Sequence, residues 1–321
     1  MKFGVSVLLG EKIVMNKLTV ILPCLNEAEN LPKLIKEIES FIPDCRIIVV
    51  DDSSSDGTGE AVSKLINQNI IVLERTQRGL RTSIFDALGY VKTSYVAVMD
   101  SDLSHPPKAL AEMFQDAKSS KDLVIGSRYV DGGKSYVSLK RHMGSWLINW
   151  FARLILGIPL KDVTGGFLCG PTKILKKIFP YLKASYGDYC IELLFYAKSM
   201  NVNFVELPFT YRWREWGETK SGTSWKYIGV GLEYGWTVLR LLWNGSHQIN
   251  GDKTEFLPPV IMESTKQPPD WMREPWAHKL SCLWNAQRSL WTIQLKGKLA
   301  KAREIHRSRS DIEDIYNVVT N

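Results

Sequence analysis

Short apolar runs alternate with amphipathic segments along the first part of the chain. The runs are rich in Val, Ile and Leu and stop at proline or at acidic residues, which is typical of buried strands that lead into loops. Strands are predicted at residues 18–22, 47–50, 70–73, 95–99 and 122–126. Between them, apolar positions three and four residues apart predict helices. Alternating units of this size predict an α/β fold, with a mostly parallel sheet flanked by helices.

The later part of the chain has a different pattern. Residues 145–160 and 225–243 are rich in Trp, Leu and Tyr or Phe, and each predicts either a buried helix or a helix that lies on a bilayer. Residues 244–269 are polar and contain proline, as linkers do. Helical spacing then returns at Leu280, Leu283, Trp284, Leu290 and Trp291. The predicted organisation is an α/β domain over 17–244, followed by a linker and a basic, Trp-containing helical extension over 245–321.

Composition and charge narrow the choice of partners and of compartment. The 321 residues are 45% hydrophobic and 23% charged, the balance of a globular protein, and the net charge of +7 favours an anionic partner. That partner is nucleic acid, a lipid surface or a phosphorylated substrate. Five scattered cysteines offer neither a zinc site nor a redox dithiol and fit a reducing compartment. No run reaches the roughly 18 apolar residues of a spanning helix, so any work at a membrane is expected at its surface.

Polar clusters follow three of the predicted strands. They are Asn26-Glu27, Asp51-Asp52 and Asp100-Ser101-Asp102. In an open α/β sheet the carboxyl ends of the strands carry the ligand site, so the three clusters are expected to lie together. A pair of aspartates two residues apart can present carboxylates to Mg²⁺ or Mn²⁺, which in turn binds a diphosphate. Solvated turn aspartates are the alternative, but the strand before the pair and His105-Pro106-Pro107 after it favour a functional site.

Six segments spread over most of residues 19–220 carry a resemblance. In chain order they are VILPCLNEAENLP, VVDDSSSDGT, VMDSDLSHPP, VIGSRYVDGG, LKDVTGGFL and VELPFTYRWREWGETK. They resemble the family 2 glycosyltransferases of the GT-A (Rossmann-like) fold, and among these the dolichyl- and polyprenyl-phosphate mannose synthases. The resemblance implies an inverting transfer, dependent on Mg²⁺ or Mn²⁺, of mannose from GDP-mannose to a polyprenyl or dolichyl monophosphate. The alternatives keep the fold but use a UDP-sugar such as UDP-glucose, or a saccharide acceptor.

The resemblance also implies which residues bind the substrates. Those expected around the base and ribose are Pro23, Leu25, Glu27, Val50 and Asp52. Those expected at the metal and the diphosphate are Asp100, Ser101, Asp102 and Arg128, with Asp102 and Arg128 in the catalytic role. Those expected to reach phosphates from later in the chain are Arg141 and Ser145, at the acceptor, and Arg214 and Lys220. Members of this family often have Gln where Ser104 stands, so a third metal contact at Ser104 would pass through water.

The chemistry of a lipid phosphate explains why no catalytic base is expected. Its second pKa is about 6, so the attacking oxygen is already anionic near neutral pH. The physical difficulty is bringing two anions together, which metal and cations resolve. An insoluble acceptor also predicts a peripheral enzyme at the cytosolic face of a membrane, and a membrane-anchoring protein partner is compatible with this. Nucleic acid is not an expected partner, because the basic residues are scattered and no binding motif is present.

Overall fold

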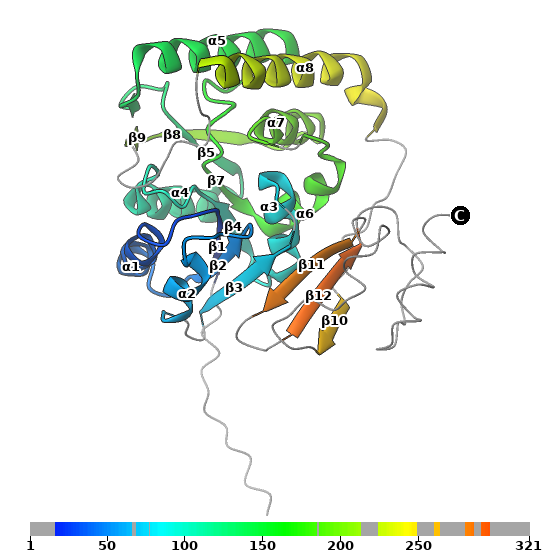
Figure 1. Ribbon diagram of the computed structural model, residues 1–321. Helices are drawn as coiled ribbons and strands as arrows, with labels where there is room; N and C mark the ends of the chain where they lie inside the picture. The colour runs from blue at the N-terminus through cyan, green and yellow to red at the C-terminus, as the bar shows by residue number, and fades with distance from the viewer. Residues whose placement is uncertain are drawn as a thin grey trace, which may run out of the picture.

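The computed structural model describes residues 17–65, 69–76, 78–184, 186–212, 224–248, 260–263, 280–285 and 290–295. Within them a large sheet has the strand order β10-β12-β11-β3-β2-β1-β4-β7-β5-β8 (Figure 1). Its strands are β1 (Leu18–Cys24), β2 (Arg46–Asp51), β3 (Ile70–Arg75), β4 (Tyr95–Val98), β5 (Leu123–Ser127), β7 (Leu168–Pro171), β8 (Phe204–Pro208), β10 (Val260–Glu263), β11 (Leu280–Asn285) and β12 (Leu290–Leu295). A small second sheet pairs β6 (Lys134–Ser135) with β9 (Thr210–Tyr211).

Helices cover the sheet on both faces. They are α1 (Leu31–Phe41), α2 (Thr58–Ser63), α3 (Leu80–Tyr90), α4 (Pro107–Ser120), α5 (Leu139–Leu156), α6 (Thr172–Ile178), α7 (Tyr189–Ser199) and α8 (Ser224–Gln248), with a short 3₁₀ turn at Phe179–Tyr181. In the described part of the chain, no helix is long and apolar enough to cross a membrane. Because α8 runs to Gln248, it continues past the boundary that the sequence predicts at residue 244.

The centre of the sheet is parallel, as the sequence predicts. Strands β3, β2, β1 and β4 run in one direction, and β5 is parallel to β8. Strand β7 lies between β4 and β5 and is antiparallel to both. The expected α/β architecture, a mostly parallel sheet flanked by helices, is therefore confirmed.

Two hydrophobic cores lie on the two faces of the sheet, because successive strand residues point to opposite sides. In β1, Val20 belongs to one core together with Leu34 of α1. Its neighbour Ile21 belongs to the other core together with Ile84 of α3. Burial on both faces explains why the strands read as continuous apolar runs. The carboxyl-end loops are thereby fixed on a rigid support.

The C-terminal residues correct one prediction. The spacing over residues 280–291 predicts a helix, but the structure has strands β11 and β12, which pair antiparallel to each other. Strand β11 pairs with the edge of β3, which would otherwise leave its backbone groups unpaired. Periodicity does not distinguish a helix from a strand in apolar runs this short. Figure 1 shows these strands in orange beside β3. The basic residues after 295 lie outside the described part, and the division into two domains stays a prediction.

Candidate active site

The loops after β1, β2 and β4 meet at one edge of the sheet. Strand β1 lies between the other two, so its loop touches both neighbours. The Ser101 hydroxyl donates to the Pro23 carbonyl at 2.9 Å, and the Asn26 amide donates to the Ser54 hydroxyl at 2.8 Å. Asn26 has a φ of 55°, a left-handed conformation that asparagine tolerates better than most residues. The three polar clusters of the sequence therefore form one contiguous surface.

Asp100 and Asp102 leave the end of β4 with different surroundings. The Asp100 side chain is 46% exposed. One carboxylate oxygen of Asp102 accepts the Ser104 amide at 3.1 Å and the Ser104 hydroxyl at 2.6 Å. Ser104 is completely buried, so its hydroxyl acts on the orientation of Asp102. A water-mediated contact of Ser104 with a metal stays a prediction.

The donor set at this position fits a divalent cation that also binds phosphate. Over the residues placed by the structure, no cluster of three or more His, Cys, Asp or Glu side chains forms a metal site. Two carboxylates alone suit Mg²⁺ or Mn²⁺, hard ions that commonly keep one or two protein carboxylates and take further oxygens from a substrate's phosphates. Beside them the buried Nε2 atom of His105 has no hydrogen-bond partner. Asp100 and Asp102 therefore fit a metal that is completed by a diphosphate.

The residues expected around the base and ribose differ in burial. Glu27 is 2% exposed, and its carboxylate accepts a hydrogen bond from Nδ2 of the Asn30 side chain at 2.7 Å. Pro23 and Leu25 are partly exposed. The side chain of Val50 is fully buried in the core, so any contact with a nucleotide falls to its backbone. Their contacts with a nucleotide stay predictions.

Arg128 is held by a buried carboxylate. Its Nε and Nη2 atoms donate to the two oxygens of Asp162 at 2.7 and 2.8 Å, and its backbone amide donates to the same carboxylate at 3.0 Å. Burial alone would lower the pKa of Arg128, but Asp162 raises it well above its ordinary value, so the cation is permanent. The rings of Tyr129 and Tyr211 lie 5.3 and 5.7 Å from the guanidinium. A phosphate arriving at this position would meet a fixed positive charge.

A chain of side-chain contacts joins Arg128 to the residues expected at the acceptor. Thr164 accepts from Arg128 Nη2 at 3.0 Å and from Asn149 Nδ2 at 3.0 Å. The same Asn149 nitrogen donates to the Ser145 carbonyl at 2.8 Å. Arg141 lies on the same helix, α5, one turn before Ser145. The structure therefore connects Arg128 with α5, whereas Arg214 and Lys220 lie outside the described residues.

The pKa of Tyr211 is influenced by charged groups of both signs. Burial, followed by the Asp100 and Asp102 carboxylates, raises the pKa of Tyr211 to about 12, while Arg141 acts to lower it. All three charged groups are thus within electrostatic reach of one phenol. The paired aspartates and Arg141 therefore lie around the same residue, Tyr211, and their joint role in a substrate site stays a prediction.

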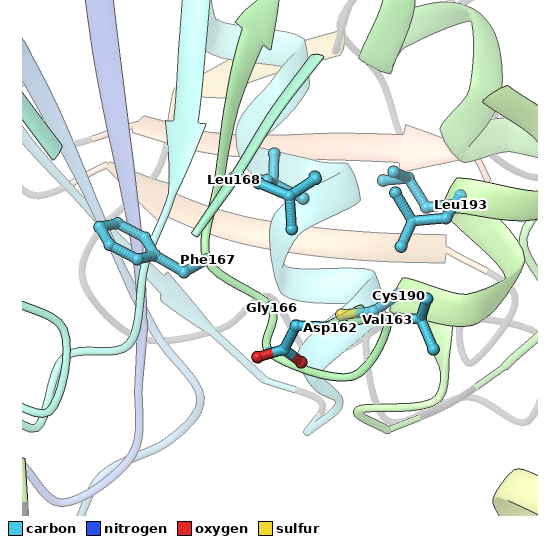
Figure 2. Close-up of a pocket in the computed structure, with 10 residues that line it drawn as sticks. Asp162, Val163, Gly166, Phe167, Leu168, Cys190 and Leu193 are labelled. Atoms are coloured by element: carbon cyan, nitrogen blue, oxygen red, sulfur yellow. The ribbon is translucent and has the colours of Figure 1, made fainter. Parts of the chain in front are cut away.

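A separate cavity lies behind this site. Figure 2 shows it between the loop at residues 162–168 and α7, with Leu168, Cys190 and Leu193 among the residues around it. Its lining is largely apolar, and Asp162 is its only charged residue. Neither Asp100 nor Asp102 borders it. It is a packing void beside Asp162, the carboxylate that holds Arg128, and it is unsuited to a nucleotide.

The family model described as Glycosyl transferase family 2 matches residues 19–179, half of the chain. The chain belongs to glycosyl transferase family 2. It is 33% identical over 215 residues to the polyprenol monophosphomannose synthase of Mycolicibacterium smegmatis, covering 64% of this chain and 81% of that one. It is 32% identical over 214 residues to the undecaprenyl-phosphate mannosyltransferase of Micrococcus luteus, covering 64% and 87%. The expectation of a glycosyltransferase is therefore confirmed.

A solved structure supports the fold of this glycosyltransferase. The chain superposes on glucosyl-3-phosphoglycerate synthase from Mycobacterium tuberculosis, in complex with Mn²⁺, UDP-glucose and phosphoglyceric acid, with a TM-score of 0.56. The match covers 71% of this chain and 80% of that chain at 16% identity. This likeness confirms the GT-A fold.

One buried residue beside the site of this glycosyltransferase, Arg75, was not predicted from the sequence. Arg75, the last residue of β3, donates to the carboxylates of Asp52 and Asp86, the latter at 2.9 Å. Asp52 also accepts the Gly79 amide at 2.8 Å. Asp52 is thus fixed from two sides, close to the expected ribose position. The one signal in the sequence is an arginine at the end of an apolar run, where a strand meets the site edge.

Proposed function

We propose that this glycosyltransferase moves mannose from GDP-mannose to a polyprenyl or dolichyl monophosphate, with inversion at the anomeric carbon. The observation that carries the proposal is the continuity of the site. Arg128 is joined through Thr164 and Asn149 to α5, which bears Arg141 and Ser145, and Asp100, Asp102 and Arg141 all influence the pKa of Tyr211. A donor diphosphate and an acceptor phosphate would thus meet on one surface. The names of the two curated relatives support the lipid phosphate and the mannosyl group.

The residues divide the work by charge. Mg²⁺ or Mn²⁺, held by Asp100 and Asp102, would supply neutralisation of the leaving diphosphate. Arg128 keeps a fixed cation beside the phosphates, because Asp162 locks its guanidinium plane. Arg141 and Ser145 orient the acceptor phosphate. Its anionic oxygen forms a bond to the anomeric carbon as the bond to the diphosphate oxygen breaks, and the nucleoside diphosphate leaves with that electron pair.

The helices α5 and α8 supply a surface for the lipid. They pack side by side at one end of the molecule, away from β10, β11 and β12 (Figure 1). Most of their exposed side chains are large and apolar, although Lys140 and Glu233 are exposed as well. The large apolar ones are Leu139, Met143, Trp146, Leu147, Trp150, Leu154, Leu232, Trp236, Leu239, Leu242 and Trp243. Trp and Leu on the outer face of a helix are typical of a bilayer interface. This supports peripheral attachment to a membrane, with which a membrane-anchoring protein partner is compatible; the cytosolic face is part of the proposal.

The sequence predicts residues 145–160 and 225–243 either as buried helices or as helices that lie on a bilayer, and the structure is compatible with both descriptions at once. The inner face of α5 buries Asn149, Ala152 and Leu156, while its outer face carries the exposed tryptophans. Both helices are packed on the protein and exposed at once. We propose that the exposed face, continuous with Arg141 and Ser145, brings the head of the lipid acceptor to the site.

Asp102→Asn tests the assignment. The change keeps the size of the side chain and removes the charge needed for a cation, so transfer should fall at least a hundredfold, about 3 kcal/mol in the barrier, with the fold retained. The assay follows labelled sugar from GDP-mannose or UDP-glucose into polyprenyl phosphate with Mg²⁺ present, and circular dichroism monitors the fold. Undiminished transfer by the variant refutes the role of Asp102. Label entering only from UDP-glucose supports the UDP-sugar alternative.

A further inference from the structure

His105 lies directly behind the paired aspartates in a closed aromatic cage. Its ring stacks on Phe167, with centroids 4.5 Å apart and planes 12° apart. The rings of Phe209 and Tyr211 contact it edge-on, at 5.3 and 5.8 Å. The side chain is completely buried. Three aromatic neighbours and full burial fix the plane of the imidazole.

Both ring nitrogens of His105 lie near one residue, Asp100. The Asp100 backbone amide donates to Nδ1 at 3.0 Å, so Nδ1 carries no proton and the neutral ring has its hydrogen on Nε2. Nε2 lies 3.8 Å from Oδ2 of Asp100 and has no hydrogen-bond partner of its own. A buried N–H without a partner costs free energy, typically about 1–3 kcal/mol. Such an atom in a well-packed cage calls for a functional explanation.

We infer that His105 is a positioning residue for Asp100: Nδ1 anchors the Asp100 backbone, and Nε2–H donates to Oδ2 when the carboxylate turns toward a divalent cation. The inference rests on the proposed function, because it takes Asp100 as a metal ligand. The Asp100 side chain is 46% exposed, which leaves it room for the small rotation that shortens 3.8 Å to a hydrogen bond. A second hydrogen bond to a ligating carboxylate fixes its direction and conserves its charge for the metal.

The surrounding charges agree with a neutral donor. Burial lowers the pKa of His105, against the opposite influence of Asp100 and Asp102, while Arg128 also lowers it. A neutral imidazole adds no positive charge that would compete with the cation for the carboxylate. Because Nδ1 accepts the Asp100 backbone amide and the side chain is completely buried, the role is orientation, without proton transfer to a substrate.

The test measures Mn²⁺ binding directly, apart from turnover. Mn²⁺ is titrated into the full chain with GDP or UDP present, by calorimetry and by electron paramagnetic resonance. His105→Phe keeps the ring and the cage but removes both nitrogens, and the Kd of Mn²⁺ should rise about 10–100-fold, the usual effect of losing such a partner. His105→Asn restores an acceptor near the Nδ1 position but has no donor near Nε2, so its Kd should lie between those of His105→Phe and the native chain.

Phe114→Leu is the matched control. Phe114 is a buried aromatic residue of α4 that packs edge-on against Tyr95, the first residue of β4, whereas the aspartates follow the last residue of that strand. Its truncation should lower the thermal midpoint and leave the Kd of Mn²⁺ unchanged. In turnover, His105→Phe should raise the Mn²⁺ requirement and leave KM for the lipid acceptor unchanged. A purely structural role would change the melting temperature and KM together.

The outcomes separate the two proposals. A native chain that binds no Mn²⁺ with either nucleotide overturns the metal part of the proposed function, and the role of His105 with it. Native binding together with a His105→Phe Kd within about twofold overturns the role of His105 alone. Native affinity in His105→Asn overturns the Nε2 contact. If His105→Phe does not fold, His105→Asn carries the test, and in that case its Kd must rise for the inference to stand.

Discussion

Replacing Asp162 by asparagine removes one partner of a buried ion pair with almost no change of shape. The Asp162 side chain is completely buried, and that of Arg128 is 13% exposed. The two carboxylate oxygens receive Arg128 Nε, Nη2 and backbone N–H at 2.7 to 3.0 Å. An asparagine offers one acceptor oxygen and an NH₂ group that faces these donors. Arg128 would then keep its charge in a site that water reaches poorly.

The expected loss follows from that geometry. Breaking a buried pair from one side costs about 3–5 kcal/mol, because the remaining charge is uncompensated. We expect the free energy of unfolding of Asp162→Asn to fall by about 3 kcal/mol or more, and transfer activity to fall as the Arg128 guanidinium loses its fixed plane. The Glu60–Lys64 pair is the contrast, since its side chains are 77% and 72% exposed and 3.4 Å apart. Glu60→Gln should change stability by less than about 1 kcal/mol.

Urea unfolding followed by circular dichroism measures both variants against the native chain. The slope of each transition must match that of the native chain, so that the midpoints report stability. A loss below about 1 kcal/mol in Asp162→Asn would refute the reasoning, because it would show that Arg128 finds another partner or water. Equal losses in Asp162→Asn and Glu60→Gln would refute it as well.

Three further changes test other parts of the structure. Burial raises the pKa of the Cys45 thiol to about 12. The stability that the neutral thiol contributes is therefore complete below its ordinary pKa and is lost as pH rises toward 12. The urea midpoints at about pH 8 and pH 10.5 should differ less in Cys45→Ala than in the native chain. A Cβ on Gly126 would lie 2.5 Å from Phe167 Cδ1, so Gly126→Ala should destabilise by about 1–3 kcal/mol in the same urea assay and weaken Mn²⁺ binding through the ring that stacks on His105. Trp236 is 68% exposed, and Trp236→Glu should reduce sedimentation with anionic vesicles while circular dichroism stays unchanged.

The parallel strands and the paired aspartates could be predicted because their signals are local. Each strand is an apolar, β-branched run that stops at proline or acid, and a parallel sheet brings such ends to one edge. Strand β7 has no such signal, since its four residues, Leu168–Pro171, include glycine and proline. Its place between β4 and β5 depends on tertiary packing alone. The predicted C-terminal helix is wrong for a related reason, because these residues form strands by pairing with the edge of β3, a contact that local spacing does not reveal.

The ion pairs of the site could not be predicted from local sequence patterns. Arg75 and Asp52 are 23 residues apart, and Arg128 and Asp162 are 34 apart. Arg75 looks like a surface residue in the sequence, which is the usual fate of this residue type. Arg128 is predicted at the phosphates, but no local pattern pairs it with Asp162. What makes them different is burial, which the fold creates and which makes an unpaired cation costly. The carboxylates that orient the cations are therefore found only once the loops are placed.

Asn149 joins the loop that holds Arg128 to the helix that carries Arg141 and Ser145. It is 2% exposed, and its Oδ1 accepts the buried Val163 amide at 2.6 Å while Nδ2 donates to Ser145 and Thr164. The loop that holds Arg128 is thereby fastened to the helix with the exposed apolar face. Transfer between two anions requires their phosphates to be aligned closely, since small misplacements cost large factors in rate. A rigid amide between loop and helix meets that requirement, because a replacement without an acceptor at the Oδ1 position would leave the Val163 amide buried and unpaired.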